Sequence, residues 1–331
     1  MKALTSSVLR RLADGEFHSG EALARSLDVS RASVWNAIRD LEAMRLEVYK
    51  VHGRGYRLQQ AVSLLDPAVV EQHLGADAGR FVLDIRDTVD STNTLLLERA
   101  AAGAPGGTVL AAEWQTGGRG RLGRAWHAGV GEALTFSLLW RTARSAGALS
   151  GLTLAVGVAL ARALESAGAD GVALKWPNDV LWRIGKIAGV LTELQGDALG
   201  PTAVVIGVGI NVRLSEATRA RIGQVAADLE TACGAAPDRN RLLAGVLIEL
   251  DRVLEAFGRA GFASLRDEWQ RRHAQQGRRV TLTLPDGTRR SGRARGVAED
   301  GALLLETRLG TQRFHSGEVS LRPASAKKQN K

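Results

Sequence analysis

Residues 117–124 form a glycine-rich basic segment in which Arg119, Arg121 and Arg124 stand among four glycines, including Gly120. Glycines let backbone N–H groups approach an oxyanion closely, and a forked guanidinium matches the oxygens of a phosphate or carboxylate. The segment therefore predicts a loop that wraps an anionic ligand; a basic RNA-binding linker is the alternative that it leaves open. The pattern GxxxxGK[ST] occurs nowhere in the chain, so this is not a phosphate-binding loop of that kind.

A second group of polar residues flanks a predicted turn, in Lys175-Trp176-Pro177-Asn178-Asp179 and then at Lys186. Lys175 comes near the end of a predicted strand, the proline makes the turn rigid, and Asn178 and Asp179 present polar groups at its edge. Lys186 enters the next strand close to two glycines, where its point charge can contact both a carboxylate and a phosphate. A solvent-exposed lysine in a hairpin is the alternative.

Small polar residues also open a predicted helix and end a predicted strand. Hydroxyl and amide groups at a helix start ordinarily cap it, which is the default interpretation of Ser91, Thr92 and Asn93. Residues 207–212 carry two glycines and include Asn211, so a neighbouring group can lie flat against this strand. A close crossing of two strands is the alternative.

The composition of the chain limits the class of protein to which these residues can belong. At 331 residues, 45% hydrophobic and 24% charged, the chain predicts two or three globular domains. Its one cysteine, Cys233, forms no intrachain disulfide, and the histidines and cysteine lack zinc-site spacing, so no metal ligands are assigned and a reducing cytoplasm is expected. The apolar stretch 146–161 is shorter than the roughly 20 residues of a membrane span and predicts a buried helix. Residues 1–20 lack a signal-peptide core.

Residues 1–63 predict a winged helix-turn-helix domain. A first helix is expected over 6–13, Ser19 and Ser30 can cap the next two helices, and residues 46–58 alternate around Gly53-Arg54-Gly55 as a hairpin wing. Side chains of the third helix and the wing suit base edges and phosphates: Arg31, Ser33, Asn36, Arg39, Lys50, His52, Arg54 and Arg57. A protein-interaction module of the same shape is the alternative.

Strands and helices alternate from residue 64 to about 270, which predicts one α+β domain with a mixed sheet. The expected strands are 80–86, 108–113, 133–140, 172–176, 187–194 and 203–212, and the long helices are 152–168 and 241–258. From 271 to 323 the period becomes two, and about five short strands predict a small β-barrel. Residues 324–331 predict a disordered basic tail.

Charge is uneven along the chain. The net charge is +3 over residues 1–63, −3 over 64–270 and +9 over 271–331. Basic ends fit anionic partners at one or both ends, and a solvated basic face explains them equally well.

Five motifs in chain order, STN, GGRGRLGRAW, KWPNDV, GKIAGVLTEL and GVGINV, resemble those of the bacterial biotin protein ligases. The resemblance includes the helix-turn-helix and the C-terminal GEVSLR, and is to the bifunctional type that is both ligase and biotin-operon repressor. It implies an α+β multidomain protein whose central domain is similar to class II aminoacyl-tRNA synthetases and whose C-terminal barrel is SH3-like.

The resemblance also implies roles at matched positions. Ser91, Thr92 and Gln115 would bind the ureido ring of biotin, with Asn93 supporting them. Arg119, Gly120 and Arg121 would order over biotin and the adenylate, and Lys186 would contact the biotin carboxylate and the phosphate. Asn178, Asp179 and Asn211 would lie on the side of ATP and Mg²⁺.

The implied reaction joins biotin and ATP into biotinyl-5′-AMP and transfers biotin to a lysine of biotin carboxyl carrier protein. Arg119, Arg121 and Lys186 are the expected catalytic cations. The implied partners also include operator DNA and a second copy in an adenylate-bound homodimer, and no membrane. A lipoate-type ligase and a non-catalytic ligand-sensing regulator are the competing hypotheses.

One segment departs from the family pattern. Residues 213–229, the expected mobile loop over adenine, contain no Phe, Tyr or Trp. Aliphatic side chains such as Leu214 or Ile222 would have to cover the base.

Overall fold

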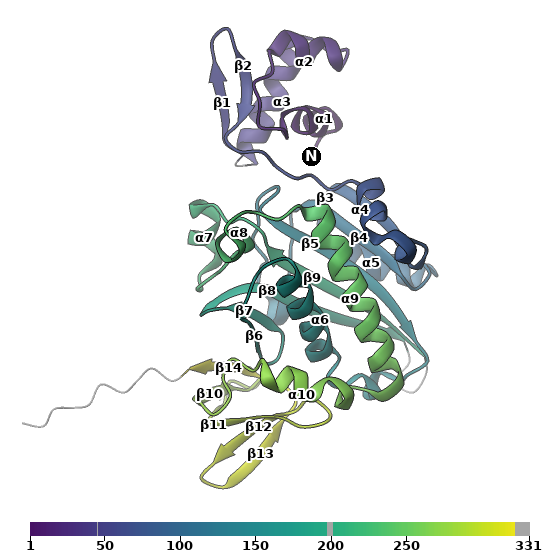
Figure 1. The fold of residues 1–331 in the computed structure, drawn as a ribbon, viewed down its shortest axis with the longest axis vertical. Coiled ribbons are helices and arrows are strands. Elements are labelled where there is room, and N and C mark those ends of the chain that lie inside the picture. The colour runs from purple at the N-terminus through teal and green to yellow at the C-terminus, as the bar shows by residue number, and fades with distance from the viewer. Residues whose placement is uncertain (45, 197–200, 322–331) are drawn as a thin grey trace, which may run out of the picture.

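The computed structural model describes residues 1–44, 46–196 and 201–321, which form three parts in chain order (Figure 1). The helical N-terminal part and the β-rich C-terminal part lie at opposite ends of a larger central domain. The predicted tail, 324–331, lies outside the described residues.

The N-terminal part confirms the predicted winged helix-turn-helix. It contains α1 (Ala3–Leu12), α2 (Gly20–Ser26), α3 (Arg31–Ala43) and the antiparallel strands β1 (Val48–Val51) and β2 (Gly55–Leu58). The Ser19 hydroxyl accepts from the Ala22 N–H and the Ser30 hydroxyl from the Ser33 N–H, so both predicted caps form.

The N-terminal part packs on the central domain through polar and apolar contacts. The Met1 amine donates to Thr88 Oγ1 over 3.0 Å, and Val130 of the central domain joins the core of the N-terminal part. A fully buried ion pair between Arg239 and Glu113 holds the connecting segment, because Arg239 Nε also donates to the Ser63 carbonyl over 2.7 Å.

A seven-stranded sheet forms the centre of the central domain, with the order β3-β4-β5-β9-β8-β7-β6. Only β3 and β4 pair in parallel, so the sheet is mixed as predicted. Its strands are β3 (Val82–Val89), β4 (Thr108–Gln115), β5 (Ala133–Thr142), β6 (Val172–Lys175), β7 (Asp179–Trp182), β8 (Gly185–Gly196) and β9 (Thr202–Asn211). The sequence did not predict β7, whose four residues directly follow a proline turn.

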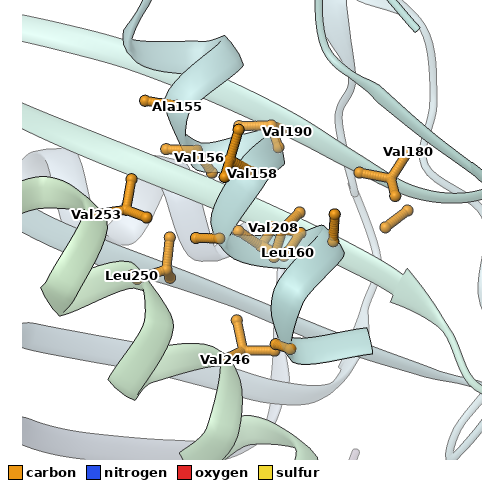
Figure 2. Packing of buried hydrophobic residues seen from close by; sticks show 14 of the residues in the cluster. Ala155, Val156, Val158, Leu160, Val180, Val190, Val208, Val246, Leu250 and Val253 are labelled. Atoms are coloured by element: carbon orange, nitrogen blue, oxygen red, sulfur yellow. The ribbon is translucent and has the colours of Figure 1, made fainter. Parts of the chain in front are cut away.

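Helices cover both faces of this sheet. One face carries α6 (Leu152–Ser166) and α9 (Arg239–Ala260), whose side chains meet in the main core (Figure 2). The other face carries α5 (Thr92–Ala101), which packs Leu96 and Ala100 on the sheet. The remaining helices are α4 (Pro67–Leu74), α7 (Glu216–Ile222), α8 (Leu229–Cys233) and α10 (Ala263–Arg271), with 3-10 turns η1 (Gly75–Arg80), η2 (Arg121–Gly123) and η3 (Ala146–Leu149).

The most apolar helix belongs to the core. The stretch Ala146–Ser166 is long and apolar enough to cross a membrane by composition, yet two thirds of it is buried inside the fold. It packs on the sheet beside α9 (Figure 2), as the prediction of a buried helix requires.

The C-terminal part is a five-stranded antiparallel sheet with the order β13-β12-β11-β10-β14. Its strands are β10 (Arg279–Thr283), β11 (Arg289–Val297), β12 (Leu303–Thr307), β13 (Gly310–Phe314) and β14 (Glu318–Leu321). The five predicted short strands are therefore confirmed, and β13 and β14 are the outer strands in the described pairing. Trp176 Nε1 donates to the Gly301 carbonyl over 3.1 Å, which anchors this sheet to the central domain.

Candidate active site

A cavity of about 510 Å³ opens beside the central sheet, and every predicted ligand-binding residue of the central domain lines it. Those residues are Ser91, Thr92, Asn93, Gln115, Arg119, Gly120, Arg121, Asn178, Asp179, Lys186 and Asn211. They come from the start of α5, the end of β4, the glycine-rich loop, the β6–β7 turn and strands β8 and β9. Folding thus brings together motifs that are far apart in sequence.

One end of the cavity is polar and neutral. The Thr92 backbone N–H donates to Gln115 Oε1 over 2.8 Å, and the Thr92 hydroxyl lies 3.2 Å from the same oxygen. The hydroxyl oxygens of Ser137 and Thr92 lie 2.7 Å apart, and the Ser91 hydroxyl caps α5. The Gln115 amide nitrogen has no hydrogen-bond partner among residues 1–44, 46–196 and 201–321, so it can donate to a neutral ligand carbonyl.

Asn93 and Glu193 connect this end to the glycine-rich loop. Asn93 is buried; its Oδ1 accepts from the Ser137 hydroxyl over 2.5 Å and its Nδ2 donates to Glu193 Oε2 over 2.8 Å. The same carboxylate oxygen accepts from Arg119 Nη2 over 3.2 Å. Glu193 therefore joins the first predicted loop arginine to the floor of the neutral end.

An indole ring fills the space left by the glycines of β8 and β9. A Cβ at Gly209 would lie 2.5 Å from Trp126, and a Cβ at Gly189 would lie 3.6 Å from it. The group that lies flat against the predicted glycine strand is therefore the Trp126 side chain. Its Nε1 is buried without a partner in the described part of the chain, and the ring lies in the cavity wall.

The opposite end of the cavity is charged. Lys186 Nζ lies 2.6 Å from Asp179 Oδ1, and Lys175 Nζ lies 3.5 Å from Asp179 Oδ2. Lys186 also lies 5.9 Å from the centre of the Trp126 ring, within cation–π range. Its side chain is 19% exposed, so the alternative of a solvated surface lysine does not hold.

Arg121 and Arg124 extend the cationic wall. Arg121 Nη1 donates to Asn178 Oδ1 over 3.3 Å, and burial lowers the pKa of the Arg121 guanidinium from its usual value. Arg124 forms an ion pair with Glu318 of β14, and that hydrogen bond lowers the pKa of the Glu318 carboxyl. The C-terminal sheet thus contributes a wall residue and holds the end of the glycine-rich loop.

The Asn211 side chain forms hydrogen bonds with backbone carbonyls beside the cavity. Its Nδ2 donates to the carbonyls of Lys186 (3.1 Å) and Ala227 (3.0 Å), and the side chain is buried. This amide therefore fixes the strand that carries Lys186 against the segment that follows β9.

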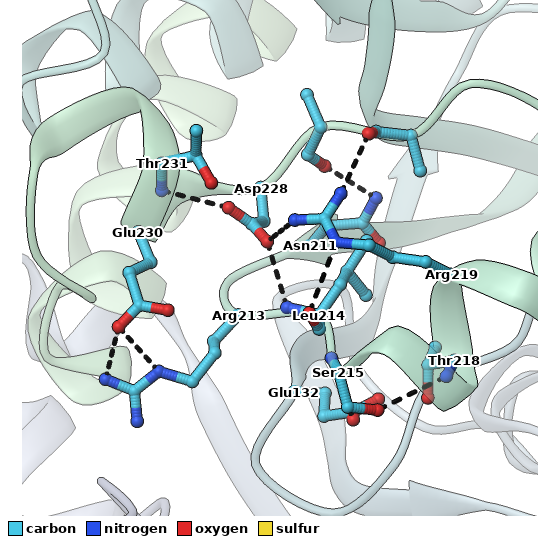
Figure 3. Close-up of polar contacts among 12 residues, drawn as sticks. Glu132, Asn211, Arg213, Leu214, Ser215, Thr218, Arg219, Asp228, Glu230 and Thr231 are labelled. Carbon is cyan, nitrogen blue, oxygen red and sulfur yellow. Dashed lines mark hydrogen bonds and ion pairs between the residues drawn. The ribbon is translucent and has the colours of Figure 1, made fainter.

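The segment expected over adenine folds around a buried carboxylate (Figure 3). Asp228 accepts from the Leu214 N–H over 3.0 Å and pairs with Arg219 of α7. Ile222 lines the cavity together with Gln224, whereas Leu214 is buried beneath it and is not among the lining residues. Of the two aliphatic candidates, Ile222 is the one placed to cover a base.

The predicted DNA-contacting residues of α3 differ in exposure. Arg31, Asn36 and Arg39 of α3 are exposed, while Ser33 is partly covered by the Ser30 cap. Arg39 lies 4.9 Å from the ring of Trp35, an exposed aromatic that the sequence prediction omitted.

The basic side chains of the predicted wing contact other residues of the N-terminal part. Arg54 and Arg57 lie 4.1 and 5.0 Å from the Phe17 ring, and Lys50 pairs with Glu42 at 2.8 Å. Stacking on an aromatic ring keeps a guanidinium charged and oriented, so both arginines still present donors.

Several residues of the site had no predicted role. Trp126 lines the cavity from inside a quoted motif but packs on a distant strand, and Glu318 lines it from another domain. Glu193, also inside a quoted motif, lies outside the lining and acts through its contacts with Asn93 and Arg119. Gln224 lies in a segment without a motif. No spacing in the sequence marks these contacts, because each depends on sheet register or domain packing.

Family models match all three parts of the chain. The biotin/lipoate A/B protein ligase family matches residues 86–211, an HTH domain matches 5–57, and the biotin protein ligase C terminal domain matches 277–322. These ranges fall within the predicted domains 64–270, 1–63 and 271–323.

Whole proteins show the same similarity. The chain is 37% identical to the bifunctional ligase/repressor BirA of Escherichia coli, over 95% of each chain. It is 36% identical to the protein of the same name from Salmonella typhimurium, over 96% of this chain and 97% of that one. The solved biotin protein ligase from Aquifex aeolicus in complex with biotin and ATP aligns with a TM-score of 0.62 at 32% identity, covering 73% of this chain and 98% of that chain.

Proposed function

The chain belongs to the family of bifunctional biotin protein ligases and repressors, and we propose that its cavity forms biotinyl-5′-AMP and transfers biotin to a lysine of biotin carboxyl carrier protein. The observation that carries this proposal is the polarity of the cavity, which has a neutral hydrogen-bonding end and a cationic end. Biotin has the matching form, a neutral ureido ring at one end and a carboxylate at the other.

The chemistry has two displacement steps. A biotin carboxylate oxygen attacks the α-phosphorus of ATP, and pyrophosphate leaves with the electrons of the broken P–O bond. The acceptor lysine amine then attacks the acyl carbon and loses a proton, and AMP leaves. Neither step needs a protein nucleophile, so positioning and charge stabilisation supply the catalysis.

Different residues bind the ureido ring and position the two reacting anions. Ser91, Thr92 and Gln115 hold the ureido ring at the neutral end, supported by Asn93. Lys186 draws the carboxylate and the α-phosphate together, because a compact ammonium can contact both anions at once.

The loop arginines retain the intermediate. Arg119 and Arg121 sit in a glycine-rich segment that can close over the adenylate and exclude water. Arg121→Gly is expected to weaken biotin binding and release adenylate that acylates lysines indiscriminately. Labelling confined to the proper acceptor would show that another element retains the adenylate.

Asn178 and Asp179 are the residues that would hold a Mg²⁺ ion bound together with ATP. Mg²⁺ is commonly held by one or two carboxylates together with phosphate oxygens, and Asp179 and Asn178 offer oxygen donors beside the cationic end. The described residues contain no group of three or more His, Cys, Asp or Glu that could hold a metal alone, which fits a cation carried mainly by ATP. Its chemistry would be to neutralise phosphate charge.

The second proposed activity is ligand-dependent repression. Exposed Arg31, Asn36 and Arg39 suit a major groove, yet Lys50 is engaged by Glu42, so one domain offers few free cations. Two adenylate-bound chains in a homodimer would bind a palindromic operator much more tightly, because the second contact becomes intramolecular. We propose a cytoplasmic location for this activity, because its substrates ATP and carrier protein and its partner DNA would be found there.

Pyrophosphate exchange tests the ligase proposal against both alternatives. With ATP and labelled pyrophosphate, biotin should support exchange, whereas lipoate and amino acids should not. Preferential exchange with lipoate would indicate a lipoate-type ligase. Exchange with none of these carboxylates would indicate a non-catalytic sensor.

A DNA titration tests the repressor proposal. Operator affinity should rise on addition of biotin plus ATP, and the salt dependence should report several phosphate contacts. Equal affinity for operator and random DNA, with no ligand effect, would leave only the ligase activity.

A further inference from the structure

The C-terminal sheet carries an arginine surface that the proposed function has not used. Along β10 and β11 burial alternates, and Arg279, Arg289 and Arg293 are exposed. These three residues define what we call the basic face. They belong to the most basic part of the chain, residues 271–331, with 14 basic and 5 acidic side chains.

Strand register places the members of the basic face on one side of the sheet. Arg279 pairs with Arg293, and Arg289 pairs with Thr283. Paired residues of an antiparallel sheet project to the same side, and like charges directly opposite each other destabilise the pairing. Arg293 also pairs in register with Glu306 of β12, whose carboxylate forms its ion pair with Arg295 at 2.8 Å, so the repulsion between Arg279 and Arg293 is only partly offset.

The basic face is also unneutralised. Arg279, Arg289 and Arg293 form no ion pair within residues 1–44, 46–196 and 201–321. Nearby arginines differ, since Arg295 pairs with Glu306 at 2.8 Å and Arg313 with Asp300 at 2.7 Å. Three adjacent free guanidinium groups attract anionic partners.

The basic face adjoins the mouth of the cavity. Thr283 pairs with Arg289 on one side and with Glu318 on the other. With strands about 4.8 Å apart, Arg289 stands two strands from the residue that lines the cavity and holds Arg124. A macromolecule that delivers a side chain into this cavity past Glu318 would pass over the same surface.

From this placement we infer that the basic face docks the acceptor protein through acidic side chains around its target lysine. This inference rests on the proposed ligase function and names residues that recruit its second substrate. The face has no aromatic or large apolar centre, and such a centre is typical of stable interfaces. It therefore suits a transient, salt-sensitive encounter in which charge raises the association rate.

The test compares two triple variants of the full-length protein with the same net charge. The test variant is Arg279→Gln/Arg289→Gln/Arg293→Gln. The control variant replaces three exposed arginines of α9 with glutamine: Arg241, Arg252 and Arg259. That helix lies in the layer that packs with α6 and lines no part of the cavity.

Both partial reactions are measured with an isolated acidic biotin-acceptor domain as the probe. In the test variant we expect kcat/KM for biotin transfer to fall about tenfold at low ionic strength, through a higher KM for the acceptor. This factor lies at the lower end of the effects that electrostatic steering has on association rates. The difference should shrink as salt rises. Biotin-dependent pyrophosphate exchange, which needs no acceptor, should stay at the wild-type rate in both variants.

Three results would overturn the inference. Unchanged transfer in the test variant would show that the face does not recruit the acceptor, and reduced binding to random duplex DNA in that variant would then assign it to nucleic acid. An equal loss in the control variant would attribute the effect to net charge. A parallel loss of exchange would show damage to the cavity, whereas absence of exchange in the wild type would instead refute the ligase proposal.

Discussion

Replacing Lys186 with alanine probes the charged end of the cavity most directly. Lys186 Nζ lies 2.6 Å from Asp179 Oδ1, and the two side chains are 19% and 15% exposed. Removing a hydrogen bond to a charged group costs about 1.5–3 kcal/mol, which is roughly a 10- to 150-fold loss of rate if the contact forms in the transition state. We expect adenylate formation to fall by that factor.

The ion-pair geometry places the expected loss at the upper end of this range. Without Lys186, the Asp179 carboxylate keeps only Lys175 at 3.5 Å. This less compensated negative charge would repel the incoming carboxylate and phosphate. A Lys186→Ala/Asp179→Asn variant removes the repulsion, so it should regain part of the activity lost by Lys186→Ala but not reach the wild type.

Biotin-dependent pyrophosphate exchange is the assay, with melting temperature as the check on folding. Lys50→Ala is the matched control, since Lys50 also pairs with a carboxylate at 2.8 Å but lies in the N-terminal part. The control should exchange at the wild-type rate. Near wild-type exchange by folded Lys186→Ala would refute the idea that one cation serves both reacting anions.

Three further predictions follow from contacts at the site and in the core. A Cβ at Gly207 would overlap the Asn93 amide, so Gly207→Ala should weaken biotin binding about tenfold by calorimetry, the equivalent of one or two lost hydrogen bonds. Glu193→Gln removes the carboxylate shared by Asn93 and Arg119, and should speed adenylate escape measured by single-turnover trapping. Burial lowers the pKa of His273 to about 4. Between pH 6.5 and 4 the unfolded state therefore binds a proton that the folded state does not yet bind. The free energy of unfolding, measured with urea, should fall by about 3 kcal/mol as the pH is lowered from above 6.5 to 4.

Matched variants separate these effects from general damage. Gly245→Ala adds a Cβ with no neighbour within 4 Å and should leave biotin affinity unchanged. Glu230→Gln removes a carboxylate paired with Arg213 outside the cavity lining and should not alter adenylate escape. His273→Asn should flatten the stability change between pH 6.5 and 4. The reasoning fails wherever a test variant behaves like its control, or where His273→Asn keeps the full pH dependence.

Local chemistry explains what the sequence predicted well. Ser19 and Ser30 cap helices because a hydroxyl reaches the free N–H groups of the first turn, a property of three or four consecutive residues. The ligand-binding residues other than Gln115 likewise sit in short motifs, and all of them line the cavity. Their individual roles toward biotin and ATP stay predictions that the variants above test.

The sequence could not predict contacts that depend on strand register or on domain packing. Trp126 lies on Gly209 because the loop returns over β9, and nothing in either motif specifies that pairing. Glu193 was quoted inside a strand without a role, since its two partners come from α5 and from the loop. Glu318 reaches the cavity only through the packing of the C-terminal sheet. Such partners follow from three-dimensional placement alone.

The three loop arginines contact polar or acidic groups of the protein. Arg119 pairs with Glu193 and Arg124 with Glu318, while Arg121 contacts the Asn178 amide. Both ion pairs are substantially exposed, and exposed pairs contribute only about 0–1 kcal/mol each.

A phosphate or carboxylate held within the cavity forms charge-assisted contacts of about 1.5–3 kcal/mol, so it can displace the protein carboxylates from these arginines. Closure of the loop is then an exchange of weak internal ion pairs for stronger ligand contacts. We infer that the same exchange would free Arg124 from Glu318 of β14, so that adenylate binding would also change how the C-terminal sheet is held beside the cavity. The basic face would therefore meet the acceptor on a surface whose position depends on whether the first reaction step has occurred.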